Sequence, residues 1–156
     1  YLDTETVVET QMLTEIIAGK QSRLFESLLE KGYINKGFSS ELTEGRGFAI
    51  GMFSGQSAYP EQVADEIKRE ISRLQTEGID EDDFRSVQRM FYGRSVMMFN
   101  DVEGIGDALT GAACSESGLF DELDVIKNVT ADKLIKRLGE QFAQERSALS
   151  IILPKR

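Results

Sequence analysis

The stretch from Ser22 to Ser57 most constrains the fold, because a helix, a stop signal and two strand-like segments follow one another within it. Ser22 suits a helix N-cap, and Gly32 can adopt the left-handed backbone conformation that ends helices. The residues between them repeat at the spacing of one helical face: Leu24, Phe25, Leu28 and Leu29. This part of the chain is therefore predicted to be a short amphipathic helix with defined ends.

Two strands are predicted directly after this helix. Residues 34–43 contain Phe, Ser and Thr, and residues 47–54 are apolar on both faces. Glu44-Gly45 between them predicts a tight turn, and so short a connection forces antiparallel pairing. A third, buried strand is predicted at Ala148 to Leu153, a short apolar run that Pro154 ends.

The rest of the chain is predicted to be largely helical. Helices are expected over residues 4–18, from Pro60 to a stop at Gly78, from Asp80 onward, from Asn100-Asp101 onward, over Leu119 to Ile126, and from Thr130 to Phe142. The helix after Asp101 is expected to carry a stripe of Val102, Ile105, Leu109 and Ala112. Two adjoining strands and a distant third predict an α+β domain, an antiparallel sheet covered by several helices.

Composition restricts the possible partners more than it restricts the fold. The chain has 156 residues, which predicts a single domain over residues 1–156. A net charge of −9 argues against nucleic acid and against an anionic membrane, because both attract basic surfaces. The single cysteine, Cys114, is interpreted as a small buried apolar residue. Since no disulfide framework, signal peptide or long apolar run is present, a cytoplasmic location is expected.

The sequence contains no histidine, which removes several kinds of active site. A serine or cysteine triad of the usual kind needs an imidazole base, and catalytic zinc is usually held by imidazole. No catalytic or metal-ligating residue is therefore assigned, and no cofactor is expected in this chain. A small enzyme that uses paired carboxylates is disfavoured, because the acidic clusters lie at helix starts, where capping explains them. The chain opens Tyr1-Leu2-Asp3, and we expect it to be the C-terminal fragment of a larger protein.

Ser22-Arg23-Leu24-Phe25, followed by Leu29-Glu30-Lys31-Gly32, resembles the C-terminal half-domain of the insulinase/pitrilysin family of zinc peptidases, which includes the mitochondrial processing peptidase. The same order of signals continues with Tyr59-Pro60-Glu61 and with Ile126 to Asp132. The variant Gly32-Tyr33-Ile34-Asn35 is similar to the bacterial YmfH-type branch. The resemblance covers nearly all of the chain and implies a LuxS/mitochondrial-processing-peptidase-like metallohydrolase half-domain.

This resemblance implies a larger protein in which similar half-domains face each other around a closed chamber. Zinc is expected in the N-terminal half, held by an inverted His-x-x-Glu-His motif and a downstream Glu. In active members the C-terminal half often lends an arginine and a tyrosine to the substrate, and here Leu29 and Asn35 stand in those places. The candidate substrate contacts are Tyr33, Asn35, Lys36 and Arg46, with an ordinary solvated surface as the alternative.

Two functions remain open after the resemblance. The first is the non-catalytic C-terminal half of a zinc-dependent endopeptidase, which forms chamber wall, contacts a peptide substrate and docks on the zinc-bearing half. The second is a metal-free relative that acts as a structural or scaffolding subunit. They differ in whether His-x-x-Glu-His is encoded upstream of Tyr1, and this chain alone is expected to be inactive in either case.

The resemblance also predicts an incomplete sheet. Half-domains of this family normally begin with a strand before the first helix, whereas this sequence opens almost at that helix. The sheet is therefore expected to expose a free edge, through which the chain could form a homodimer.

Overall fold

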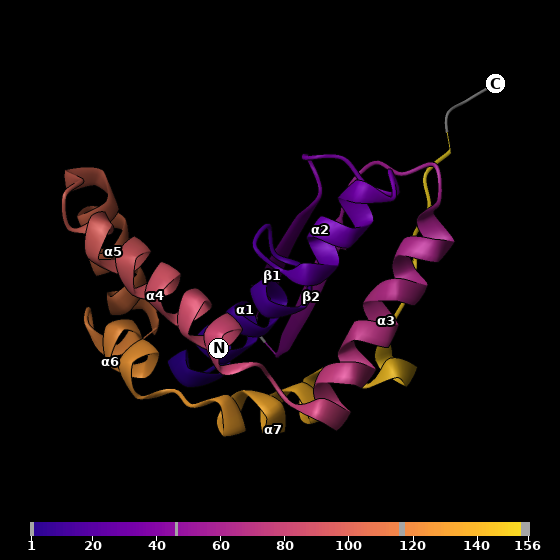
Figure 1. Cartoon of the computed structure of the whole chain (residues 1–156). Coiled ribbons are helices and arrows are strands. Elements are labelled where there is room, and N and C mark those ends of the chain that lie inside the picture. The colour runs from indigo at the N-terminus through magenta and orange to yellow at the C-terminus, as the bar shows by residue number, and fades with distance from the viewer. Residues whose placement is uncertain (1, 46, 116–117, 154–156) are drawn as a thin grey trace.

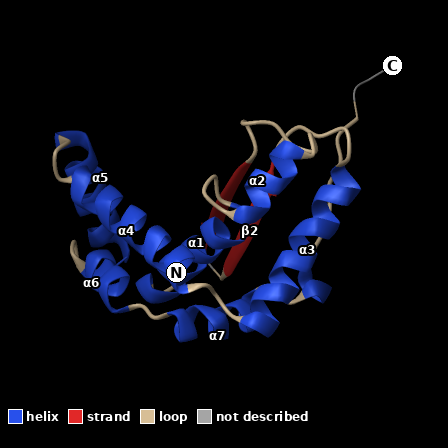
Figure 2. Ribbon diagram, in the orientation of Figure 1, coloured by secondary structure: helices blue, strands red, loops and turns tan. Residues whose placement is uncertain are grey.

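The computed structural model describes residues 2–45, 47–115 and 118–153. Two helices lead into a β-hairpin, and further helices follow it, in an α+β fold (Figures 1 and 2). The elements are α1 Thr4–Ala18, α2 Arg23–Glu30, β1 Ser39–Gly45, β2 Phe48–Ser54, α3 Pro60–Glu77, α4 Glu81–Met98, α5 Val102–Ser115, α6 Asp121–Asn128, α7 Ala131–Gln141 and the short 3-10 turn Gln144–Arg146. Among the described residues, none of these helices has the length and apolarity needed to cross a membrane.

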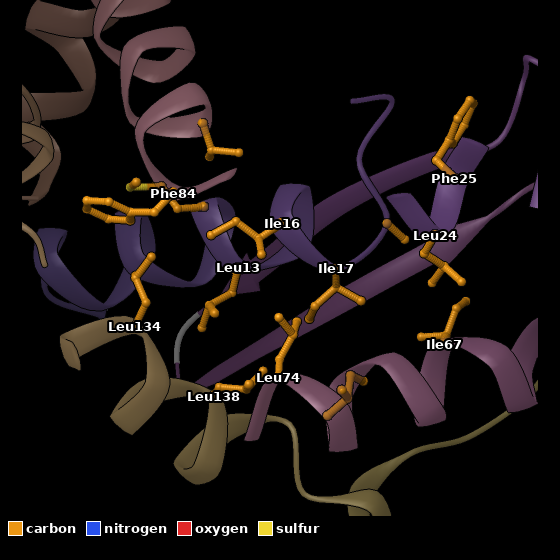
Figure 3. Close-up of a cluster of buried hydrophobic side chains, with 14 of the residues drawn as sticks. Leu13, Ile16, Ile17, Leu24, Phe25, Ile67, Leu74, Phe84, Leu134 and Leu138 are labelled. Atoms are coloured by element: carbon orange, nitrogen blue, oxygen red, sulfur yellow. The ribbon is translucent and has the colours of Figure 1, made fainter. Parts of the chain in front are cut away.

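Helix α1 is the centre of the fold. It packs against both strands and against α2, α3, α4, α6 and α7, so it is covered on nearly every side (Figure 1). Its apolar side chains meet those of the surrounding helices in one continuous core, in which Leu13, Ile17 and Leu138 lose all contact with solvent (Figure 3). The helix predicted over residues 4–18 is therefore buried around most of its circumference.

Burial on so many sides forces polar side chains of α1 into the interior, and each has a partner. The Glu9 carboxylate is 4% exposed and accepts a hydrogen bond from the Arg137 guanidinium of α7 at 2.8 Å. The Thr10 hydroxyl lies 2.5 Å from the Gln141 amide oxygen. Thr14 donates to the Gln11 carbonyl within the helix. The contacts of Glu9 and Thr10 fix how α7 sits along α1, because an unpaired polar group at this depth would be costly.

The predicted helix ends are confirmed. The Ser22 hydroxyl accepts the Phe25 N–H at 3.1 Å, and the Thr130 hydroxyl accepts the Lys133 N–H at 3.3 Å. Asp80 accepts the Asp82 and Asp83 N–H groups at the start of α4, which lowers its pKa. Gly32, with φ of 68°, follows α2, and the Tyr33 N–H returns to the Leu28 carbonyl.

The hairpin is antiparallel as predicted, but its turn lies two residues later than expected. Gly45 pairs with Phe48, so Glu44 and Gly45 belong to β1, and the chain turns only after Gly45. Gly47 has φ of 86°, a backbone conformation that glycine adopts without strain. Glu44, which was predicted to lie in the turn, would be strained in this conformation. The first strand also begins at Ser39 rather than at Ile34, because the intervening residues form a loop.

The two faces of the hairpin differ in their environment. One face packs on α1 and on the end of α7, where Gly51 leaves room for Phe142: a Cβ at Gly51 would lie 2.9 Å from the Phe142 ring. The other face is exposed, and on it Phe48, Ile50 and Met52 of β2 stand opposite Gly45, Thr43 and Glu41 of β1. Among the described residues the sheet has only these two strands, so each strand keeps one unpaired edge.

The predicted third strand is wrong. Residues 147–153 have no ladder partner among the described residues, and Leu149 is 50% and Ile152 is 93% exposed. The segment leaves α7 with Gln144 hydrogen-bonded to Ser72 of α3 and then runs on in the yellow trace of Figure 1. An apolar run becomes a buried strand only beside another strand, and no described strand lies next to this run. Pro154, its predicted end, lies outside the described residues.

The predicted helix after Asp101 is present as α5, but only half of its expected stripe is covered. Ile105 and Ala112 lie on the partly covered side with Gly104 and Ala108, whereas Val102 is 85% and Leu109 is 51% exposed. Cys114 is exposed rather than buried. The helix lies at the outer end of the arm formed by α4 and α6, so little of its surface is covered (Figure 1).

Removing one partner of the Glu9–Arg137 pair should cost more than removing both. Arg137→Met leaves a buried carboxylate without its cation, and we expect a loss of about 2–3 kcal/mol in the free energy of unfolding. Glu9→Met combined with Arg137→Met should recover much of that loss, because neither charge then remains. Urea unfolding of the two variants measures this difference.

The exposed Glu81–Arg85 pair provides the control. Arg85→Met breaks an ion pair between side chains that are 63% and 65% exposed, and it should cost less than about 0.5 kcal/mol. A double variant as unstable as Arg137→Met would contradict the role given to the buried pair.

The N-cap of α1 makes stability depend on pH. The Thr6 N–H, 2.8 Å away, holds the pKa of Asp3 below its usual range, against the opposing effect of burial. The contribution of this carboxylate is complete above its unfolded pKa, about 4, and is lost as pH falls through the lower folded value. Asp3→Asn keeps a cap without a charge. Between about pH 5 and about pH 2.5 the melting temperature of the unmodified chain should fall more than that of Asp3→Asn; parallel curves by circular dichroism would refute this.

Candidate functional site

The loop between α2 and β1 carries three of the four predicted substrate contacts. Gly32 ends α2, and two buried side chains then anchor the loop, Ile34 at 6% and Phe38 at 4% exposure. The ring of Phe38 lies 6.3 Å from that of Phe25 on α2. Because both anchors point into the core, residues 35–37 between them are raised to the surface. We call residues 33–38 the entry loop.

Asn35 shapes the entry loop. Its side-chain oxygen accepts the Gly37 N–H at 2.8 Å, and its carbonyl accepts the Phe38 N–H at 3.1 Å. This Asx turn displays Lys36, whose ammonium group is exposed and forms no ion pair with any described residue. The Asn35 oxygen is therefore engaged in holding the turn, whereas Lys36 is available for contact.

Tyr33 ties the entry loop to the start of α3. Its ring lies 5.1 Å from the ring of Tyr59, and Lys31 Nζ lies 6.0 Å from the Tyr33 ring. The Ser57 hydroxyl donates to the Tyr33 carbonyl at 2.5 Å and accepts the Tyr59 N–H at 2.8 Å. The half-buried Tyr33 ring thus helps to position the loop, while Tyr59 is 46% exposed beside it.

The fourth predicted contact, Arg46, lies outside the described residues. Gly45, the residue before it in the sequence, ends β1 at the hairpin turn, whereas the entry loop leads into Ser39. Seven residues of strand separate the two ends of β1, a span of roughly 20 Å. The structure therefore groups Tyr33, Asn35 and Lys36 and places the hairpin turn at the other end of the strand.

The exposed face of β2 was missed by the sequence analysis. Phe48, Ile50 and Met52 are 48%, 52% and 38% exposed, and they stand opposite Gly45, Thr43 and Glu41 of β1. Their spacing of two residues puts all three on one face, which is the signal that could have revealed it. We call these three residues the sheet patch. An exposed apolar row next to two unpaired strand edges is suited to contact with another polypeptide.

The residues present do not fit a zinc site. The sequence supplies no imidazole, and the described residues contain no group of three Cys, Asp or Glu side chains that could surround a metal ion. Leu29, in the place where the resemblance would put an arginine, is partly buried against the core. No step of metal chemistry is therefore assigned to this chain.

A shallow hollow lies elsewhere on the surface. It measures about 460 Å³ and is formed by the first turns of α4 together with residues 129–132 at the start of α7. Arg85 lines it but is already paired with Glu81 at 2.8 Å. Of the described residues, neither Tyr33, Asn35 and Lys36 nor any residue of the sheet patch takes part in it.

Comparison with solved structures supports the fold. The chain superposes with a TM-score of 0.82 on a crystal structure assigned as an M16-like peptidase from Alicyclobacillus acidocaldarius, at 22% identity, covering 90% of this chain and 34% of that one. It also superposes on the structure of the inactive domain of a protein assigned as a zinc protease from Bordetella parapertussis, with a TM-score of 0.79 and 14% identity, covering 97% and 86%.

Sequence comparison identifies the family. The chain is 29% identical over 144 residues to the uncharacterized zinc protease YmfH of Bacillus subtilis (strain 168), covering 92% of this chain. It spans only 33% of the length of that relative. The family described as the Peptidase M16 inactive domain matches residues 1–91, more than half of the sequence. The predicted resemblance is thus confirmed, and the chain belongs to the Peptidase M16 inactive-domain family.

Proposed function

We propose that this chain is the non-catalytic C-terminal half of a zinc-dependent endopeptidase and that it supplies wall and substrate contacts to the reaction chamber. The membership in an inactive peptidase domain family carries the proposal. The lack of histidine supports it, because hydrolytic zinc has to be held by another part of the protein. The relatives YmfH and the Alicyclobacillus protein are about three times as long as the matched region, which leaves room for such a part.

The sheet patch and the entry loop are the surfaces proposed to meet a peptide. Phe48, Ile50 and Met52 offer apolar contacts spaced two residues apart, the same period as side chains on one side of an extended peptide. Each strand also has an unpaired edge that can hydrogen-bond to an extended chain. Lys36 at the tip of the entry loop adds a cation that would attract acidic groups of a substrate.

The unpaired edges are equally open to other strands of the same protein or to a second copy of this chain. A homodimer through the sheet stays a prediction. So does docking on a zinc-bearing half, and so does the cytoplasmic location expected from the sequence.

The second candidate function is a metal-free scaffold. It is favoured by the loss of both functional groups that the resemblance assigns to this half, since Leu29 is packed on the core and the side-chain oxygen of Asn35 holds the entry loop. Such a subunit would retain the fold and its partner surfaces and would cleave no peptide.

Zinc content and cleavage by the longer protein distinguish the two functions. We expect the longer protein to encode His-x-x-Glu-His upstream of Tyr1, to hold one zinc ion by elemental analysis, and to cut unfolded peptides. The 156-residue chain alone should neither hold zinc nor cut peptides. A longer protein without zinc or cleavage would favour the scaffold, and zinc-dependent cleavage by this chain alone would refute both functions.

A charge in the sheet patch should weaken cleavage without removing the metal. In the longer protein, Ile50→Glu puts a carboxylate where an apolar contact with substrate is proposed, and we expect kcat/KM to fall about fivefold or more with zinc content unchanged. Met97→Glu is the matched control, because Met97 is 70% exposed on α4, away from the sheet. Equal activity of the two variants would remove the sheet patch from the substrate path.

A further inference from the structure

Helix α5 is joined to the rest of the fold by little packing. None of its residues whose side chains are described is buried, although the helix is 14 residues long. The shorter helices α2 and α6 bury Leu28 and Ile126 completely. Helix α5 has no extensive contact with any described helix or strand, and it lies at the outer end of the arm (Figure 1). Tertiary packing, which supplies most of the stability of helices in proteins, is therefore nearly absent here.

The sequence of α5 gives the helix little stability of its own. It contains Gly104, Gly106 and Gly111, and glycine loses more backbone entropy in a helix than any other residue. Glu103 and Asp107 lie four residues apart, where like charges repel each other, and neither pairs with a cation among the described residues. A helix of this length and composition is marginal in water when it is not packed against a partner.

Local hydrogen bonds hold α5 in its helical state. The Asp101 carboxylate accepts the Glu103 N–H at 3.3 Å and the Gly104 N–H at 3.1 Å, which caps the start of the helix. The Thr110 hydroxyl donates to the Gly106 carbonyl at 2.8 Å within the helix. Each of these contacts joins residues at most four positions apart. All of them can therefore break together without disturbing the core around α1.

The helices on either side of α5 are anchored without it. Helix α4 buries Phe91 in the core, and its Gln88 amide donates to the Ile126 carbonyl of α6 at 2.8 Å. The Ser95 hydroxyl of α4 donates to the Glu122 carboxylate of α6 at 2.9 Å. Both α4 and α6 also pack on α1. The arm therefore keeps its shape through contacts between α4, α6 and α1 in which α5 takes no part.

We propose that α5 opens and recloses as a unit of its own while the rest of the fold stays intact. The rings of Phe99, before α5, and Phe120, after it, stack 5.4 Å apart, so the open state is a loop whose two ends remain together. Helix α5 is then an order–disorder element at the outer end of the arm. The proposal is independent of the peptidase function, because it uses neither the sheet patch nor the entry loop.

Amide hydrogen exchange of the 156-residue chain, read by mass spectrometry at increasing urea below the unfolding transition, tests the proposal. The α5 amides should exchange at rates that urea changes little, because a local opening exposes little surface. The α1 amides should exchange at least about a hundredfold more slowly, after correction for intrinsic rates, and should accelerate with urea because they require global unfolding.

Two matched glycine substitutions separate local opening from global unfolding. Gly106 in α5 and Gly139 in α7 are both exposed, and an added Cβ would meet nothing within 4 Å at either position. Gly106→Ala should slow exchange of the α5 amides roughly fivefold, because alanine favours the helical state over the open one. Gly139→Ala should raise the urea midpoint and slow the α1 amides roughly fivefold. It should leave the α5 amides unchanged, because local opening of α5 does not involve α7.

Three other outcomes would each overturn the proposal. If Gly139→Ala slowed the α5 amides as much as the α1 amides, α5 would exchange only when the whole fold unfolds. Protection of the α5 amides equal to that of the α1 amides would lead to the same conclusion. If the α5 amides exchanged at unprotected rates both in the unmodified chain and in Gly106→Ala, no closed state of α5 would form in solution.

Discussion

The burial of α1 on nearly every side is the constraint on which the rest of the structure depends. A helix in that position has to pair the polar groups that it takes into the interior, and Glu9 and Thr10 do so through Arg137 and Gln141 of α7. These contacts join residues about 130 positions apart in the sequence, so α7 is placed by chemistry rather than by proximity along the chain. The sheet then packs on the side of α1 that α7, α4 and α6 leave open.

The placement of the hairpin on α1 decides which surfaces face outward. Gly51 meets the ring of Phe142 on the covered face, so the register of β2 is fixed there and the residues that alternate with Gly51, namely Phe48, Ile50 and Met52, are left exposed. The entry loop is fixed by two buried anchors and an Asx turn, which makes it a defined structure that presents Lys36. The surfaces proposed for peptide contact are therefore consequences of packing at α1.

The proposed function rests on a division of chemistry between two parts of one protein. This chain supplies a fold, an apolar sheet face and a cation, whereas a hydrolytic metal would require ligands that its composition lacks. A domain without catalytic residues can thus take part in a reaction through its surfaces alone.

The sequence by itself determined the local structure and the chemistry that is absent. Helix ends at Ser22, Gly32 and Thr130 follow from capping that acts over three or four residues, and the lack of imidazole is fixed by composition. Only the tertiary structure decided which apolar residues are covered. Val102, Ile152 and the sheet patch have the same hydrophobicity as core residues, and they remain exposed because no described element packs over them. Burial depends on a partner surface, and side-chain periodicity alone does not reveal whether that surface is present.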